Sequence, residues 1–340
     1  MYVAKEGRGG TVVYDAERDH YSPERLALIA ELRRAIELDE LVLHYQPQIE
    51  PETGRVGGVE ALLRWHHPER GMVSPDEFVP LAERTGLMQP LTLWVLDAAM
   101  RQCAAWRRSG LDLRVAANLS ASNLADGDTP DAIERLLERW GVPPGFLRLE
   151  ITETTAMADP GRTSAVLARL EALGMELAID DFGTGHSSLA YLRRLPVHEL
   201  KIDRSFVSGM ATDPHDAVIV AATIDLGHNL GLRVVAEGVE DEDTLRELRR
   251  RGCDLAQGYL FSRPLPAEEL ESWLLAWAES ATLDERDAWG PAGPASAISL
   301  RAGAWSPSAS KGWSARPPAG WHGSHRRRTV LFRAGPRAGR

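Results

Sequence analysis

Short apolar runs recur along the chain, and many of them stop at a polar side chain. Eight runs have the length and composition of β-strands: Leu41 to Gln46, Val56 to Glu60, Leu113 to Asn118, Leu147 to Glu150, Leu177 to Asp181, Glu199 to Asp203, Arg233 to Glu237 and Leu255 to Gln257. All eight end in a carboxylate or a carboxamide, and five of these ends form the pattern of interest: Glu60, Asn118, Glu150, the pair Asp180-Asp181 and Glu237.

Most of these runs are separated by stretches with helical periodicity, which predicts a mostly parallel sheet with helices outside it. Eight such strands indicate an α/β fold of the TIM-like (β/α)8 barrel type, in which the C-terminal strand ends converge on one site. Taken singly, a terminal Asp or Glu can also cap the next helix or face water. Because a polar residue of this kind ends five of the strands, the pattern favours one acidic cleft that these residues share.

The same pattern divides the chain into three parts. A helix is expected over Pro23 to Glu37, and the strand and helix alternation continues to a last helix over Ala267 to Ala278, so residues 23–280 are interpreted as one domain. Residues 281–340 are rich in Pro, Gly, Ser and Arg, and are predicted to be a disordered basic tail. Its Trp305, Trp313 and Trp321 suit nucleic-acid or membrane contact, a tail without a packed partner, or an altered reading frame.

Charge and composition narrow the function. The net charge is −10, yet residues 291–340 hold nine Lys or Arg and no acid, which leaves 30 basic against 49 acidic residues elsewhere. Because acidic residues outnumber basic ones in residues 1–290, this part of the chain is not expected to bind a nucleic acid polymer. No apolar run approaches the roughly 20 residues that span a membrane. With only two cysteines and no signal peptide, a cytoplasmic location is expected.

The candidate ligands are oxygen atoms, which favour Mg²⁺ or Mn²⁺ over Zn²⁺. Neighbouring side chains of a regular strand point to opposite faces, so Asp180 and Asp181 reach one site only where a strand ends. The glycines of Phe182-Gly183-Thr184-Gly185 suit such an ending, in which one Asp bridges two cations. A helix cap followed by a glycine turn is the alternative.

Two cationic residues complete the candidate chemistry. Lys201 lies among apolar strand residues, where it either points inward to orient or deprotonate water or extends to the surface. Arg64 is suited to bind a phosphate, or is a solvated residue at the start of a helix. Paired cations suit metal-assisted phosphoester cleavage. A sugar or enolase-type barrel with one Mg²⁺ would show similar carboxylates.

Six motifs in order give the chain a resemblance to a known family. They are Glu60-Ala61-Leu62-Leu63-Arg64-Trp65, Asn118-Leu119-Ser120, Glu150-Ile151-Thr152-Glu153, Asp180-Asp181-Phe182-Gly183-Thr184-Gly185, Lys201-Ile202-Asp203 and Glu237-Gly238-Val239-Glu240. Over residues 41–270 the chain resembles the EAL-domain cyclic-di-GMP phosphodiesterases. The resemblance implies a TIM-like barrel, commonly dimeric, that opens cyclic di-GMP to linear pGpG with two Mg²⁺ or Mn²⁺ ions.

The resemblance also implies individual roles. The metal ligands would be Glu60, Asn118, Glu150 and Asp180 for one ion, and Asp180, Asp181 and Glu237 for the other. Lys201 is similar to the residue that holds or activates water, and it forms the catalytic set with Asp181 and Glu237. Gln46 of Tyr45-Gln46-Pro47 resembles a guanine contact, Arg64 a phosphate contact and Gln257 a further ligand-binding residue. Glu153 matches the glutamate that anchors the loop after the paired aspartates, in which His186 stands where the family often has an aromatic residue.

The first residues of the chain have a resemblance of their own. Residues 1–22, with a short strand expected over Thr11 to Tyr14, are similar to the C-terminal end of a GGDEF domain, so the chain is expected to be a fragment or truncated product.

A receptor that binds cyclic di-GMP without cleaving it is the main alternative to a phosphodiesterase. Such relatives usually lose metal or water residues, and none of those positions is missing here.

Overall fold

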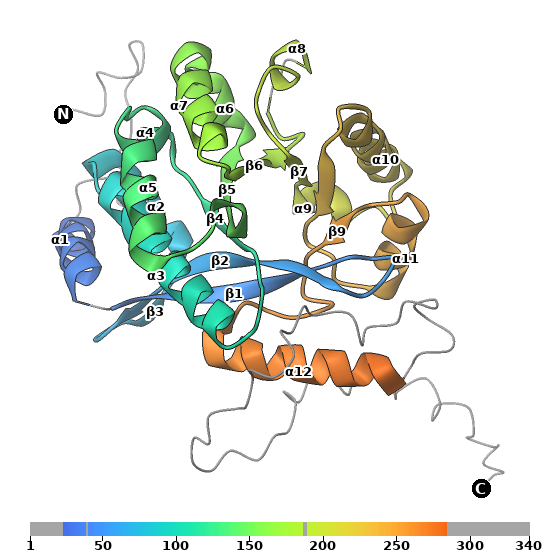
Figure 1. The fold of residues 1–340 in the computed structure, drawn as a ribbon, viewed down its shortest axis with the longest axis horizontal. Coiled ribbons are helices and arrows are strands. Elements are labelled where there is room, and N and C mark those ends of the chain that lie inside the picture. The colour runs from blue at the N-terminus through green and yellow to red at the C-terminus, as the bar shows by residue number, and fades with distance from the viewer. Residues whose placement is uncertain (1–22, 39, 186–188, 284–340) are drawn as a thin grey trace, which may run out of the picture.

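The computed structural model describes residues 23–38, 40–185 and 189–283, and it confirms the barrel predicted from the sequence (Figure 1). The eight barrel strands are β1 (Leu41–Ile49), β2 (Val56–His67), β4 (Val115–Asn118), β5 (Leu147–Thr152), β6 (Glu176–Phe182), β7 (Glu199–Ile202), β8 (Arg233–Ala236) and β9 (Leu255–Ala256). They follow this order around the barrel, and β9 returns to β1 to close it.

One strand breaks the expected parallel arrangement. β1 is antiparallel to both of its neighbours in the barrel, β2 and β9, whereas the other barrel strands, β2 and β4 to β9, run parallel to one another. β1 and β2 are joined by the tight turn of residues 50–55, which is held by a hydrogen bond from the Glu50 amide to the Arg55 carbonyl. So short a connection reverses the chain and leaves no room for a crossover helix.

The predicted end of a strand at Glu60 is wrong. β2 continues to His67 and turns into β3 (Gly71–Val73), because its antiparallel partner β1 supplies hydrogen bonds along the extension, from Gln46 opposite Glu60 to Leu41 opposite Trp65. The alternative that Arg64 begins a helix is therefore wrong as well.

Of the other predicted strand ends, Asn118 is confirmed as the last residue of β4, and the rest move by one to three residues. Glu150 and Asp180 lie inside β5 and β6, which continue to Thr152 and Phe182, whereas Glu237 and Gln257 come directly after β8 and β9. Asp203 lies outside β7, and its side chain caps the following helix by accepting a hydrogen bond from the amide of Ser205.

The helices surround the barrel (Figure 1). They are α1 (Pro23–Glu37), α2 (Pro75–Thr85), α3 (Met88–Arg108), α4 (Ala121–Leu124), α5 (Thr129–Trp140), the 3-10 helix η3 (Pro144–Phe146), α6 (Glu153–Ala158), α7 (Pro160–Ala172), α8 (Leu189–Leu192), α9 (Arg204–Val207), α10 (Pro214–Asn229), α11 (Glu242–Arg250) and α12 (Ala267–Leu283). Helix α1 has the bounds expected from the sequence, and α12, preceded by β10 (Leu265–Pro266), runs beyond the expected Ala278.

Apolar side chains fill the space between the strands and the helices. Val115, Leu149, Ile179 and Leu200 are fully buried members of one large cluster. A smaller cluster packs α1 and α2 against the extension of β2, where Trp65 meets Phe78 edge to face. Because these contacts fix the strands from outside, the polar residues of the same strands are held toward the barrel interior.

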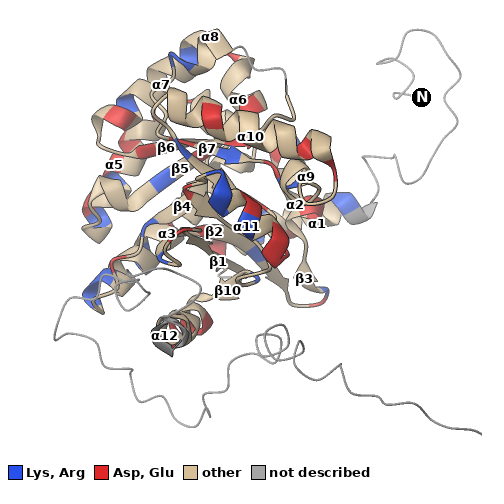
Figure 2. Ribbon diagram, turned by 90° about the vertical axis from the view of Figure 1, so that its right-hand side faces the viewer, with Lys and Arg blue, Asp and Glu red and all other residues tan. Residues whose placement is uncertain are grey.

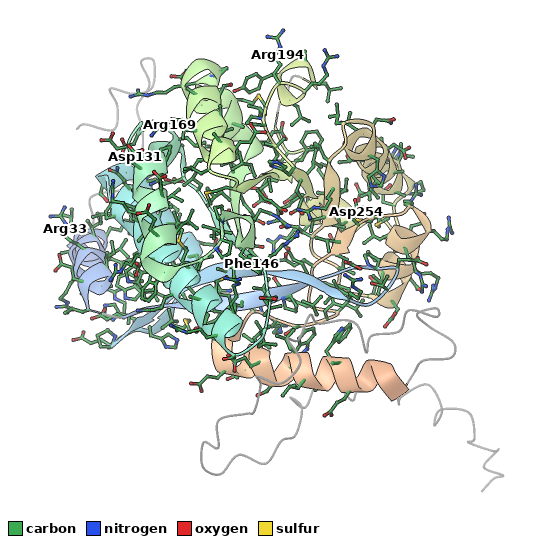
Figure 3. The ribbon with its side chains drawn as sticks, in the orientation of Figure 1. Arg33, Asp131, Phe146, Arg169, Arg194 and Asp254 are labelled. Carbon is green, nitrogen blue, oxygen red and sulfur yellow. The ribbon has the colours of Figure 1, made fainter. Side chains whose placement is uncertain are left out.

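Charged residues of both signs are spread over the outer helices (Figure 2). Arg169 of α7 and Asp131 of α5, for example, form an ion pair between neighbouring helices (Figure 3). None of the helices in the described ranges is long and apolar enough to cross a membrane. The prediction that a disordered tail begins at residue 281 is wrong for residues 281–283, which belong to α12. The rest of that expected tail, the expected strand at Thr11 to Tyr14 and His186 lie outside the described residues.

Candidate active site

Lys201 of β7 lies at the centre of the acidic residues predicted to form the site. Its Nζ atom is 2.6 Å from Oε2 of Glu150, 2.6 Å from Oε1 of Glu237, and 3.3 Å from both Oε2 of Glu60 and Oδ1 of Asp180. Its side chain is completely buried, so the alternative of a surface lysine is wrong. The structure thus brings four of the predicted carboxylates to one cation.

These contacts shift the pKa values of the group. Burial opposes the charged form of Lys201, but the surrounding carboxylates, with Asp180 and Glu150 first, outweigh it and raise its pKa well above the usual range. Burial also raises the pKa of Glu150 well above its usual value and that of Glu237 to about 8, although Lys201 acts in the opposite direction. The Lys201 ammonium is therefore fixed in place, whereas the raised pKa values of Glu150 and Glu237 favour their protonated forms unless a further cation lies beside them.

Glu60 is a buried acid whose neighbours favour its carboxylate form. Burial raises its pKa, but Lys201 and hydrogen bonds from Gln257 and Asn118 lower it below the usual value. Nε2 of Gln257 lies 2.7 Å from Oε2, and Nδ2 of Asn118 lies 3.2 Å from Oε1. Because Asn118 donates through its nitrogen, its carbonyl oxygen is left for another partner.

Asp180, Asp181 and Glu237 form a second acidic group at the mouth of the site, with one carboxylate oxygen of each within 4.8 Å of the others. Asp181 has a φ of 54°, a left-handed conformation that few residues other than glycine adopt. This turn of the backbone lets two adjacent aspartates face one site, as the sequence required. Burial, followed by the charges of Asp180 and Asp203, raises the pKa of Asp181 to about 6.

Glu153 lies beneath the loop that follows the paired aspartates. The side chain is buried at the start of α6, and its Oε2 accepts hydrogen bonds from the amides of Gly183 at 2.9 Å and Gly185 at 3.3 Å. A Cβ atom on Gly185 would lie 2.8 Å from Oε1 of Glu153, so a side chain there would displace the loop or the Glu153 carboxylate. The contacts are those that a loop anchor requires.

The predicted ligand-binding residues lie at different depths. Gln46 and Gln257 are buried, and Gln46 donates to the carbonyl of Ser262 at 3.0 Å and accepts from Nε2 of Gln257 at 3.0 Å. Both N–H bonds of Gln257 are thus used within the protein, one toward Gln46 and one toward Glu60. Gln257 therefore supports Glu60, which the sequence did not indicate.

Arg64 lies on the same face of β2 as Glu60, roughly 13 Å further along the strand. It is half-buried, and burial lowers its pKa while Tyr259 and Glu60 raise it. Its guanidinium donates to the carbonyl of Leu63 at 2.8 Å, which uses one of five N–H bonds. The remaining donors keep Arg64 suitable for an anionic ligand at the rim.

Sequence reasoning missed a second polar layer deeper in the barrel. Arg148, Gln48 and Glu199 are buried there, one step of strand alternation below Glu150, Gln46 and Lys201 respectively. Nη1 of Arg148 lies 2.5 Å from Oε1 of Glu199. The sequence does carry a signal for this layer, because each of its residues lies two positions from a site residue on the same strand.

The donor set fits divalent cations. Oε1 of Glu150 is buried and has no hydrogen-bond partner among the described residues, so it is free to bind a cation. The carboxylates of Glu60, Glu150, Asp180, Asp181 and Glu237, taken as ionised around one ammonium, leave an excess of negative charge that divalent cations would balance. All the candidate ligand atoms are oxygens, which suits magnesium-like ions.

Comparison with known proteins agrees with this geometry. Cyclic di-GMP phosphodiesterases of Pseudomonas aeruginosa are among the relatives: the bifunctional diguanylate cyclase/cyclic di-GMP phosphodiesterase MucR is 47% identical over 79% of this chain and 40% of its own length, and NbdA is 44% identical over 80% and 35%. The chain therefore spans less than half the length of these relatives.

A solved structure matches over a similar region. The PaMucR phosphodiesterase in complex with c-di-GMP is 48% identical, with a TM-score of 0.70, over 72% of this chain and 99% of that chain. The family model described as EAL domain matches residues 29–264, which include all the site residues named above. The chain belongs to the EAL domain family.

Proposed function

We propose that this chain hydrolyses cyclic di-GMP to linear pGpG. The observation that carries the proposal is the buried ring of carboxylates around Lys201, with a second acidic group at its mouth. Relatives named as cyclic di-GMP phosphodiesterases and a related phosphodiesterase structure with c-di-GMP support the choice of substrate.

Two Mg²⁺ or Mn²⁺ ions are the proposed cofactors. Glu60, Asn118, Glu150 and Asp180 would hold one ion, and Asp180, Asp181 and Glu237 the other. When bound, such a pair supplies an activated water and stabilises the attacking and leaving oxygens of the phosphodiester. The oxygen ligands, the unpartnered Oε1 of Glu150 and the close grouping of Asp180, Asp181 and Glu237 support this assignment.

The protein's own side chains position the reacting groups. Lys201 remains an ammonium, so its proposed role is to hold and orient the attacking water rather than to take its proton. Arg64 offers N–H donors at the rim to a phosphate of the substrate, and Gln46 keeps one N–H bond for a guanine. Hydrolysis forms one bond between water oxygen and phosphorus and breaks one ester bond of the ring, which leaves a linear dinucleotide.

A homodimer is the proposed assembly, on the basis of the family resemblance. Light scattering of the full chain with and without cyclic di-GMP and Mn²⁺ tests it, and a mass of one chain under both conditions would contradict it.

The product assay tests the function directly. The full chain is incubated with cyclic di-GMP and Mn²⁺, and the nucleotides are separated by chromatography. We expect pGpG in the presence of Mn²⁺ and none in EDTA. Binding of cyclic di-GMP by folded, metal-loaded protein without pGpG would overturn the proposal in favour of a receptor.

A further inference from the structure

We propose that Arg148 and Gln48 are positioning residues, which act through Gln257 to fix the orientation of the Glu60 carboxyl group. The inference rests on the proposed function, because Glu60 is there a metal ligand. The four side chains form a continuous buried series that runs from the lower polar layer of the barrel to the site.

Three contacts make up this series. Nη1 of Arg148 lies 3.4 Å from Oε1 of Gln48, Nε2 of Gln48 lies 3.0 Å from Oε1 of Gln257, and Nε2 of Gln257 lies 2.7 Å from Oε2 of Glu60. Gln48 is 1% exposed and Arg148 is 3% exposed, so water does not compete for these bonds. A buried amide in this setting keeps its partners because leaving one unpaired is costly.

The two ends of the series determine its direction. A guanidinium can only donate hydrogen bonds, and a carboxylate can only accept them. Oε1 of Gln48 must therefore face Arg148, its nitrogen must face Gln257, and the nitrogen of Gln257 must face Glu60. If both amides rotated by half a turn, an N–H group would face the Arg148 guanidinium and a carbonyl would face the Glu60 carboxylate.

Two acidic side chains hold Arg148 in place. Its guanidinium contacts Glu199 at 2.5 Å and Glu176 at 3.1 Å, and Glu199 is completely buried. Gln46 adds a second restraint on Gln257: its nitrogen donates to the carbonyl of Ser262, so its oxygen accepts the other N–H bond of Gln257. Gln257 thus has a single orientation that satisfies all of its partners.

This orientation matters because Nε2 of Gln257, which lies 2.7 Å from Oε2 of Glu60, fixes the direction in which that metal-binding group points. Partners that orient a metal ligand typically change metal affinity by about 10- to 100-fold when they are removed. Gln48 contacts none of the predicted metal ligands in the hydrogen bonds described above, so we expect its effect on the metal to pass through Gln257. The double variant separates this route from one through Arg148, whose charge also interacts with Glu150.

The test is a double-mutant cycle on Mn²⁺ affinity, measured by calorimetry on the full chain without substrate. Gln48→Met and Gln257→Met keep a similar volume and remove the hydrogen bonds. We expect each single variant to bind Mn²⁺ about tenfold or more weakly, and the double variant to bind no more weakly than Gln257→Met alone. Ile49→Val is the matched control, since it trims a buried side chain on the same strand outside the series, and it should bind Mn²⁺ like the wild type.

Two results would overturn the proposal: an unchanged Mn²⁺ affinity in Gln48→Met, or losses that add in the double variant. Gln48→Leu, which likewise lacks donor and acceptor, replaces Gln48→Met if that variant does not fold. Because the readout is metal binding, a failure of this inference is distinct from a failure of the proposed function, which the pGpG assay of the wild type decides.

Discussion

The Nζ atom of Lys201 lies 2.6 Å from Oε2 of Glu150, and both side chains are completely buried. A buried pair of this kind stabilises the fold only while both partners are present, because removing one leaves the other charge without compensation. Replacing Lys201 should therefore affect both the stability of the metal-free protein and the chemistry of the site.

Replacing Lys201 by Met should destabilise the protein in EDTA by about 3 to 5 kcal/mol, since the carboxylates around it lose their shared cation. Mn²⁺ should stabilise the variant more than it stabilises the wild type, because added cations compensate the same carboxylates. Denaturant unfolding with EDTA and with Mn²⁺ measures both effects.

Arg250→Met is the control for Lys201→Met. Arg250 pairs with Glu247 on the exposed surface of α11, where an ion pair contributes roughly 0 to 1 kcal/mol. If Lys201→Met unfolds at the same denaturant concentration as Arg250→Met in EDTA, Lys201 does not hold the carboxylates together.

Replacing Glu60 by Ala should abolish pGpG formation and weaken Mn²⁺ binding, because it removes a predicted metal ligand together with the acceptor for Lys201, Gln257 and Asn118. Glu69→Ala is the matched control, since Glu69 is exposed beyond the end of β2. Turnover at the wild-type rate in the Glu60 variant would remove Glu60 from the mechanism.

Much of this site could be predicted because polar residues in short apolar runs mark positions that face a barrel interior. Glu60, Glu150 and Lys201 were found in this way, and their convergence follows from the barrel. The antiparallel β1 could not be found by the same reasoning, since strand patterns carry no direction. That reversal also explains why Glu60 lies in the middle of β2 rather than at its end.

The lower polar layer was missed for a different physical reason. Arg148 lies in Leu147-Arg148-Leu149-Glu150, where an arginine is normally read as solvent-facing. Its distance of two residues from Glu150 places both on one face, but only the structure shows Glu199 close enough to compensate the buried guanidinium. Partners on other strands decide such cases, and sequence spacing does not supply them.

Replacing Glu176 by Gln should lower stability in a pH-dependent manner. Burial raises the pKa of Glu176, but Arg148, Arg233 and Arg114 outweigh it and lower the pKa below its usual value of 4.5. Because the folded pKa is lowered, the stabilisation is fully present above pH 4.5 and is lost as the pH falls through the folded pKa.

Unfolding at pH 7, 5 and 4 in EDTA measures this dependence. We expect the wild type to exceed Glu176→Gln by about 1 to 3 kcal/mol at pH 7 and pH 5, and by less at pH 4. A difference that grew as the pH fell would contradict the assignment, since it would require a raised pKa in the folded state.

Replacing Gly185 by Ala should impair the site with little effect on global stability. The added Cβ would lie 2.8 Å from Oε1 of Glu153, so either the loop or the Glu153 carboxylate must move, and the hydrogen bonds to the amides of Gly183 and Gly185 would weaken. Because this loop follows Asp181 directly, we expect weaker Mn²⁺ binding and at least a tenfold loss of pGpG formation. Gly145→Ala is the control, since nothing lies within 4 Å of the Cβ it would add. If Gly185→Ala and Gly145→Ala both retained wild-type Mn²⁺ affinity and turnover, Glu153 would not position the loop for the site.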